Sequence, residues 1–285
     1  MKFRNPLTND QKVKVLNTIV YLTGIYTLVF HFSWLLLGLG LIAGWFLYLT
    51  GFHGSLHMYS SHRAFRPRNK FFKYLILFAG TMTGVGSNIM WAATHRKHHK
   101  YSDHEGDPHS PVCPSVGTPG LWHNIKLWFY YFPTYHINVR TVKDLTVDKE
   151  HKFFHNNYFK IHIVFVLMLA LIDPVYIGYF WALPILYGYT GTNYIVVTCH
   201  LPKWREKIGY VNFPNERVDN SYNNKIAAIL LPGEGNHENH HVNPGAIKNA
   251  LAPGDIDLGW WWIKIIAEPK SINVNPGVWK QYYHG

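Results

Sequence analysis

The chain has 285 residues, of which 48% are hydrophobic and 16% aromatic, and its formal net charge at pH 7 is +11. This charge does not form a nucleic-acid-binding face, because the basic residues lie outside two long intervals that are nearly free of charge. Residues 16–61 contain no Lys, Arg, Asp or Glu, and residues 161–202 contain only Asp173. We therefore expect no nucleic-acid partner and predict an integral membrane protein.

The first uncharged interval predicts a helical hairpin over residues 16–56. Each interval is about forty residues long, which matches two helices that each cross a bilayer core and a tight turn between them. We expect helices over residues 19–34 and 35–54, with the turn near Phe32 and Ser33.

The first hairpin leads into the first of three histidine boxes, in which four residues separate His57 from His62. This spacing diverges on an ideal α-helix, so we expect one of the two histidines to lie past the helix end. Arg63, Arg66 and Arg68 follow directly. Because basic residues mark the cytosolic side of a membrane protein, the first box is expected in the cytosol.

A third apolar stretch, residues 71–93, is long enough to cross a membrane but contains Gly80, Gly84 and Gly86. We predict a broken helix here that is re-entrant or peripheral. A single crossing would place the histidine boxes before and after it in opposite compartments. The second box follows over residues 95–99, with the spacing H-x2-H-H.

The second uncharged interval predicts another hairpin, over residues 158–200. Its helices are expected over residues 158–175 and 177–200. The turn is placed at Asp173 and Pro174, because a proline ends the helix that precedes it. The last residue of this hairpin, His200, is a further histidine at the cytosolic end of a span.

The third box, residues 237–241, repeats the H-x2-H-H spacing, and residues 242–285 are predicted to form a C-terminal cytosolic segment. Basic residues follow both hairpins, whereas the hairpin tips carry none, so both termini and all three boxes are expected in the cytosol. The predicted fold class is an all-α, multi-pass integral membrane protein with one domain over residues 1–285. Four transmembrane helices in two hairpins would carry a cytosolic helical cap.

The histidines themselves predict a metal centre. On a helix, positions i, i+3 and i+4 share one face, so each H-x2-H-H box presents three imidazoles to one side. The full set of imidazoles suits two metal ions with about four or five ligands each. Imidazole suits iron and open positions permit oxygen chemistry, although spacing alone leaves zinc and copper open. The candidate ligands are His57, His62, His95, His98, His99, His200, His237, His240 and His241.

These boxes resemble those of the membrane fatty-acid desaturases, in particular the acyl-CoA delta-9 (stearoyl-CoA type) branch. The matching stretches are HMYSSHRAF, WAATHRKHHKYSD and LPGEGNHENHH, and the connector KDLTVDKEHKFFHNNYF is also similar. The resemblance implies a non-haem centre of two Fe with O2 as co-substrate, and a bent apolar tunnel for the acyl chain. It also implies one iron on His57, His62, His99 and His241, and the other on His95, His98, His200, His237 and His240.

The chain departs from the family pattern at Val196, where relatives usually carry an Asn that holds a metal-bound water; Asn193 is the nearest amide. Asn193, His53, Asp103 and Asp107 are the residues we expect to support the ligands. Basic residues beside the boxes are candidates for binding an acidic head group, such as that of CoA. They are Arg63, Arg66, Arg68, Arg96 and Lys97.

The resemblance implies oxygen-dependent desaturation of a fatty acyl chain, with formation of a cis double bond. The expected carrier is CoA and the expected position is delta-9-like, with a carrier protein or a membrane lipid left open as carriers. A lipid hydroxylase would use the same ligands and stays an alternative. A metal-binding membrane transporter is disfavoured, because the predicted spans hold almost no ionisable groups.

The chain also has to receive electrons from elsewhere. Gly84 and Gly86 do not begin a dinucleotide-binding fingerprint, because Ile89 stands where the third glycine would be. Haem and iron–sulfur cysteine patterns are missing as well. We therefore expect a separate cytochrome b5-like or ferredoxin-like electron donor, with its reductase, that docks on the cytosolic face.

Overall fold

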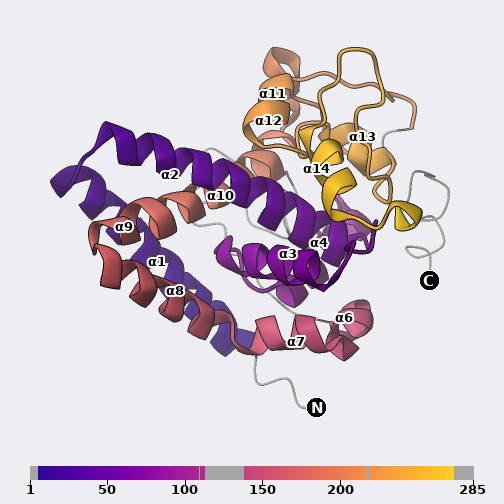
Figure 1. Cartoon of the computed structure of the whole chain (residues 1–285). Coiled ribbons are helices and arrows are strands. Elements are labelled where there is room, and N and C mark those ends of the chain that lie inside the picture. The colour runs from indigo at the N-terminus through magenta and orange to yellow at the C-terminus, as the bar shows by residue number, and fades with distance from the viewer. Residues whose placement is uncertain (1–5, 109, 113–137, 217–218, 273–285) are drawn as a thin grey trace.

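The computed structural model describes residues 6–108, 110–112, 138–216 and 219–272 (Figure 1). Every regular element in these ranges is a helix, and the strand-like features among them are two isolated β-bridges, Pro67 with Ala267 and Tyr210 with Asn223. The described residues therefore have the predicted all-α character.

The first hairpin consists of α1 (Pro6–Phe30) and α2 (Trp34–Leu47), and α2 continues directly into the π-helix η1 (Tyr48–Ser61). The turn lies over residues 31–33, close to its expected position, and the Ser33 side chain caps α2 by accepting a hydrogen bond from the Leu36 N–H. Helix α1 begins well before the expected residue 19, because residues 7–18 contain no glycine or proline to stop it. By length and composition, Gln11–Phe30 and Trp34–Ser61 could each cross a membrane.

The π-helix η1 explains how the two histidines of the first box come close together. Its wider turn places residues five apart on neighbouring positions, and the His62 N–H donates to the His57 carbonyl at 3.1 Å. His62 is the C-cap of η1, so it lies past the helix end, as expected from the spacing. A π-helix thus brings together two imidazoles that an α-helix would separate.

The stretch over residues 71–93 is broken, as predicted. Helix α3 (Lys70–Met82) ends before Gly84 and Gly86, which have φ of +78° and +98°, and α4 (Asn88–Tyr101) then starts in a new direction. Glycine is required at the first of these positions for a second reason, because a Cβ on Gly84 would lie 2.4 Å from Cγ2 of Ile185. The break turns α4 toward the cap and carries the second box with it.

The second hairpin begins with α7 (Lys149–Asn156) and α8 (Tyr158–Ile172), which are bent by 65° relative to each other. The chain turns at Asp173 and Pro174, where the Asp173 carboxylate accepts from the Val175 N–H at 2.9 Å. The returning arm is divided into four short segments: α9 (Val175–Ile177), η4 (Gly178–Ala182), α10 (Leu183–Asn193) and η5 (Tyr194–Thr198).

The described helices therefore give two candidate membrane spans, or three if the bent pair of α7 and α8 counts as one. The two hairpins pack side by side and are tied at their tips. The Tyr179 hydroxyl accepts from the Ser33 N–H and donates to the His31 carbonyl, each at 2.8 Å. The tips consequently act as one end of the bundle.

The cap lies at the opposite end of the hairpins from these tips (Figure 1). Most of its elements follow the second hairpin in the chain. They are α11 (Pro202–Ile208), α12 (Lys225–Leu230), α13 (His237–Val242), α14 (Leu258–Ile266) and η6 (Pro269–Ser271). The segments η3 (Val139–Val142) and α6 (Lys143–Val147) precede α7. Of the predicted C-terminal segment, residues 273–285 lie outside the described residues.

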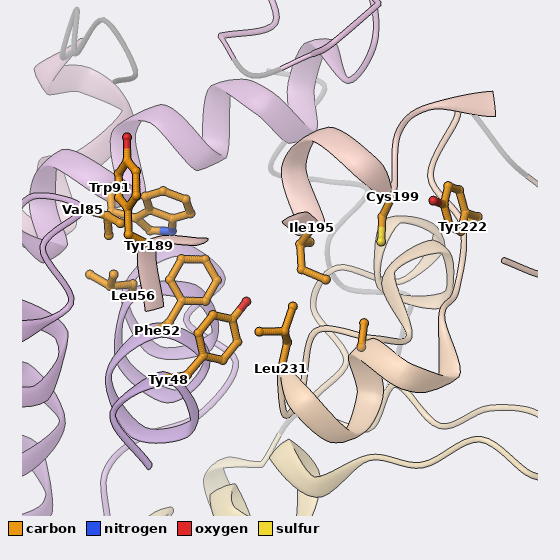
Figure 2. Packing of buried hydrophobic residues seen from close by; sticks show 11 residues of the cluster. Tyr48, Phe52, Leu56, Val85, Trp91, Tyr189, Ile195, Cys199, Tyr222 and Leu231 are labelled. Atoms are coloured by element: carbon orange, nitrogen blue, oxygen red, sulfur yellow. The ribbon is translucent and has the colours of Figure 1, made fainter. Parts of the chain in front are cut away.

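A cluster of buried apolar side chains joins the hairpins to the cap (Figure 2). Tyr48, Phe52 and Leu56 enter it from η1 and Trp91 enters it from α4, while Leu231 enters from the end of α12. This apolar cluster borders the histidine boxes, because the Phe52 ring lies 6.4 Å from the His57 ring and the Trp91 ring lies 5.8 Å from that of His95.

Candidate metal centre

The fold brings all the predicted histidine ligands to one place. Helix η1 and its C-cap supply the first box, α4 the second and α13 the third, while His200 follows η5 directly. All of these side chains are buried except that of His99, which is half-buried. Segments far apart in the chain therefore place their imidazoles in a common interior.

These imidazoles form two adjoining groups. In the first group, the ring nitrogens all lie within 4.8 Å of one another; its members are His57, His62, His95, His99 and His240. Within it, Nε2 of His95 lies 3.0 Å from Nε2 of His62 and 3.0 Å from Nε2 of His99. Ring nitrogens that converge in this way on one point can hold a metal ion.

The second group contains His98, His200 and His241, whose ring nitrogens also lie within 4.8 Å of one another. His237 joins it, because its Nε2 lies 2.9 Å from Nε2 of His200 and its ring centroid 4.4 Å from that of His241. The two groups are adjacent, since the rings of His98 and His99 are 5.5 Å apart.

At three histidines, this division differs from the one that the resemblance implied. His95 and His240 lie in the first group, and His241 lies in the second. Each H-x2-H-H box was expected to present three imidazoles to one side, but the structure divides them: the i and i+4 imidazoles point to one group, and the histidine between them points to the other. In α4 the pair is His95 and His99, and in α13 it is His237 and His241.

Carboxylates hold several of these imidazoles from behind through Nδ1. Asp107 and Asp103 accept from His98 and His200, each at 2.9 Å. Glu234 accepts from His57 at 2.6 Å and Asp219 accepts from His241 at 2.6 Å. An Nδ1–H bonded in this way leaves the unprotonated Nε2 aimed at the centre of its group, which is the form that binds metals.

Asp103 and Asp107 were expected from the sequence, whereas the roles of Glu234 and Asp219 were not. Glu234 lies just before the third box, three residues ahead of His237, where its spacing suggests a metal ligand more than a hydrogen-bond partner of a distant histidine. Asp219 lies in an irregular segment, and no local pattern marks it. Glu238, inside the third box, accepts from the backbone N–H groups of Asn212 and Phe213 and thus supports the cap.

The electrostatics of the site favour neutral imidazoles at most of the candidate ligands. His200 is the exception: burial alone would lower its pKa, but the Asp103 carboxylate raises it to about 9. Burial, together with the neighbouring imidazoles, lowers the pKa of His95, His99, His237 and His240 well below the ordinary value. The neutral form is the one that ligates a metal.

The carboxylates remain anionic in the same surroundings. Burial alone would raise the pKa of Glu234, but the imidazoles of His57 and His53 lower it to about 2. His200 and His241 likewise hold the pKa values of Asp103 and Asp219 below the usual range, against the effect of burial. Buried anions are costly unless cations compensate them, so this set of nitrogen donors backed by carboxylates fits bound metal cations.

The other residues singled out in the sequence differ in their contacts with the centre. His53 is buried, and its Nδ1 donates to the same Glu234 oxygen at 2.8 Å. Asn193 and Val196 are both buried on the returning arm of the second hairpin, and the Asn193 side chain hydrogen-bonds Tyr189.

Most of the candidate head-group residues are engaged in contacts within the protein. Arg96 forms a two-pronged ion pair with Asp144, at 2.8 and 2.9 Å, and donates to the carbonyls of Ser60 and Ser61. Arg66 pairs with Glu268, Arg68 donates to the carbonyls of Lys264 and Ala267, and Arg63 lies 3.4 Å from Asp144. Lys97 is exposed.

Comparisons with known proteins agree with this centre. The family model "Fatty acid desaturase" matches residues 32–253. An sn-1 stearoyl-lipid 9-desaturase of Synechocystis sp. is 30% identical over 278 residues, covering 92% of this chain and 81% of the relative. An sn-2 palmitoyl-lipid 9-desaturase of Nostoc sp. is 29% identical, covering 82% and 79%. An acyl-CoA 5-desaturase of Anemone leveillei is 25% identical, covering 87% and 73%. The acyl-CoA branch is therefore not singled out.

Proposed function

This chain belongs to the fatty acid desaturase family and is an O2-dependent oxidoreductase, and from that premise we propose that it forms a cis double bond in a fatty acyl chain at a di-iron centre. The observation that carries the proposal is the pair of adjoining imidazole groups, each closed around one point. The proposed ligands of one iron are His57, His62, His95, His99 and His240. Those of the other iron are His98, His200, His237 and His241.

Two bound irons would supply the activation of dioxygen and the removal of one hydrogen from each of two adjacent methylenes. Reduction of dioxygen to water in this reaction also consumes a pair of electrons, which the chain cannot generate. We therefore propose a separate cytochrome b5-like or ferredoxin-like donor, with its reductase, that docks on the cap.

The protein's own residues position the reactants. The carboxylates of Asp103, Asp107, Asp219 and Glu234 fix the orientation of the imidazoles before metal binds. Phe52 and Trp91 form the side of the apolar cluster that faces the histidine boxes, and we propose that the acyl chain passes along this cluster. Their rings, 5.0 Å apart, would exclude water from the methylenes that react.

We propose that four spans cross the membrane within a single desaturase domain: α1, α2 with η1, α8, and the returning arm from α9 to η5. The tied hairpin tips and the position of every box at the other end support this topology, with the cap and both termini in the cytosol. The double bond is proposed at a delta-9-like position. The resemblance of the boxes implied CoA as the acyl carrier, whereas the relatives are named as acting on lipids, on CoA esters or on carrier protein.

Expression in a desaturase-deficient host tests this function. We expect gas chromatography with mass spectrometry to find a new cis-monounsaturated acyl chain with the wild type and with His31→Ala, whose histidine is exposed at a hairpin tip. The His98→Ala variant should form none. Accumulation of a hydroxylated acyl chain in place of the unsaturated one would instead identify a lipid hydroxylase.

A further inference from the structure

The short helix α12 is apolar on two opposite sides. Its outward face carries Ile226, Ile229 and Leu230, whose exposed fractions are 65%, 50% and 53%. These positions follow the i, i+3, i+4 spacing of one helix face. Ala227 and Ala228 on the other side are buried, and a helix that is apolar all round does not face water stably.

Helix α12 is fastened to the side of the membrane hairpins. The Trp45 indole N–H donates to the Ile229 carbonyl at 2.9 Å, and the Tyr187 hydroxyl donates to the Leu230 carbonyl. Trp45 belongs to the candidate span Trp34–Ser61, whose outward side chains Ile42 and Phe46 are also exposed. The exposed aliphatic face of α12 therefore continues an outer surface that already faces lipid.

The charges near α12 fit a membrane surface. Lys225 begins the helix, and the preceding α11 carries Lys203, Arg205 and Lys207 against one acid, Glu206. Exposed apolar residues beside basic ones are typical of elements that lie in the interface, with their cations among lipid phosphates.

The inner side of α12 faces the apolar cluster that borders the candidate metal centre. Leu231, directly after the helix, packs on Gly191, where an added Cβ would lie 2.3 Å from Leu231 Cδ2 and 3.0 Å from Tyr48 Cε2. In Figure 2 the Leu231 side chain lies between Ile195 and Tyr48 in the apolar cluster. Three residues further along the chain, Glu234 binds His57. A single short helix thus separates the outer apolar surface from the cluster beside the candidate iron ligands.

We propose that α12 lies in the membrane leaflet next to the cap and that the acyl chain of a membrane glycerolipid passes beside it to reach the metal centre. The inference rests on the proposed desaturation and names its substrate class: an acyl chain still esterified to a lipid. An acyl chain that is still part of a membrane lipid would not have to leave the bilayer to be desaturated. A CoA head group at the histidine boxes, in contrast, would require several free cations there. Of the five candidates, Arg96, Arg66, Arg68 and Arg63 are engaged within the protein, and Lys97 is exposed.

Photolabelling of the full chain in nanodiscs tests the position of α12 independently of activity. The probe is phosphatidylcholine with a diazirine in the middle of its sn-1 chain. After illumination and tryptic digestion, we expect labels in the peptide of residues 226–248, as well as in the peptide that contains α2. Labelling of α2 without any label in residues 226–248 would overturn the proposal.

A substrate competition then tests the route. Iron-loaded enzyme with a reducing system receives either distearoyl phosphatidylcholine in its nanodisc or stearoyl-CoA in nanodiscs of non-hydrolysable ether lipid. We expect the double bond in the intact phosphatidylcholine, and at least a roughly tenfold slower conversion for Ile229→Glu, because a charge in the leaflet is costly. The control Val147→Glu, at a 67% exposed position on α6, should react like the wild type.

Conversion of stearoyl-CoA alone, with Ile229→Glu as active as the wild type, would overturn the lipid route but leave desaturation intact. Conversion of neither substrate would contradict the proposed function, while the photolabelling would still decide where α12 lies. The two failures are therefore distinguishable.

Discussion

Glu234 and His57 form one of the shortest hydrogen bonds of the candidate metal centre, with Oε1 of the glutamate 2.6 Å from Nδ1 of the histidine. The same oxygen accepts from Nδ1 of His53 at 2.8 Å. Both imidazoles are buried, so one carboxylate orients a candidate ligand and is itself held by a second histidine. The His53 ring lies against Gly233 and Gly259, where an added Cβ would approach it to 2.3 Å. The glycine-containing loop before the third box is thus shaped around this pair.

Replacement of Glu234 by Gln should weaken metal binding. The amide keeps the shape of the side chain but removes the negative charge that orients His57, and loss of such a partner typically costs about 10–100-fold in metal affinity. Iron titration of the purified metal-free variant, followed by its optical spectrum, measures the change. Glu206→Gln, an exposed acid on α11, is the control. Equal iron affinity in wild type and Glu234→Gln would show that the carboxylate does not orient a ligand.

Single ligand replacements should distinguish the two imidazole groups. His240→Ala removes a nitrogen from the first group and His98→Ala one from the second, and each should abolish the unsaturated product. The affected metal should be lost preferentially, so iron per chain should fall toward about half in either variant. Membrane insertion should be unchanged. The division into groups would be wrong if the double variant His57→Ala/His240→Ala lost both irons while His98→Ala lost none.

Arg96 should be a structural residue and not a head-group ligand. Its guanidinium holds Asp144 and the carbonyls of Ser60 and Ser61, directly before His62. Arg96→Gln should lower the free energy of unfolding by about 2–3 kcal/mol, because charged hydrogen bonds are lost and Asp144 is left without its main partner. Thermal unfolding in detergent measures this. Unchanged stability with a raised KM for an acyl-CoA substrate would instead assign Arg96 to substrate binding.

The metal-free protein should lose stability on mild acidification. Buried His95, His99, His237 and His240 have pKa values lowered below those of the unfolded chain, so the unfolded state takes up protons first as the pH falls. Their contribution is present above the unfolded pKa of about 6.5 and is lost as the pH falls below it. The thermal midpoint should therefore drop between about pH 7.5 and pH 5.5. A flat profile would mean that these imidazoles are accessible to protons in the folded state.

Much of the fold could be predicted because its signals are local. The uncharged intervals placed both hairpin turns, and Gly84 and Gly86 marked the break before the second box. The wide helix η1 could not be foreseen, because a π-helix depends on what packs against it more than on its own residues. The same holds for the short segments of the returning arm, which leave two or three candidate spans where four were expected.

The same distinction between local signals and tertiary packing applies to the candidate site. The spacing of the boxes identified the histidines, since that signal lies within a few residues. The spacing pairs the i and i+4 histidines of each box, but which group each pair joins depends on how α4 and α13 face each other. Asp219 meets His241, and Arg96 meets Asp144, only through tertiary packing. Charge alone made Arg96 a head-group candidate, and the structure gives it partners within the protein.

The most direct test of the account is the metal content of the purified full chain after iron-replete growth, measured by elemental analysis together with Mössbauer spectroscopy. The proposed centre predicts about two irons per chain, in a non-haem, nitrogen-rich environment, and their loss in parallel with desaturase activity on chelation. Zinc as the only bound metal, or full desaturation by protein freed of iron, would contradict it.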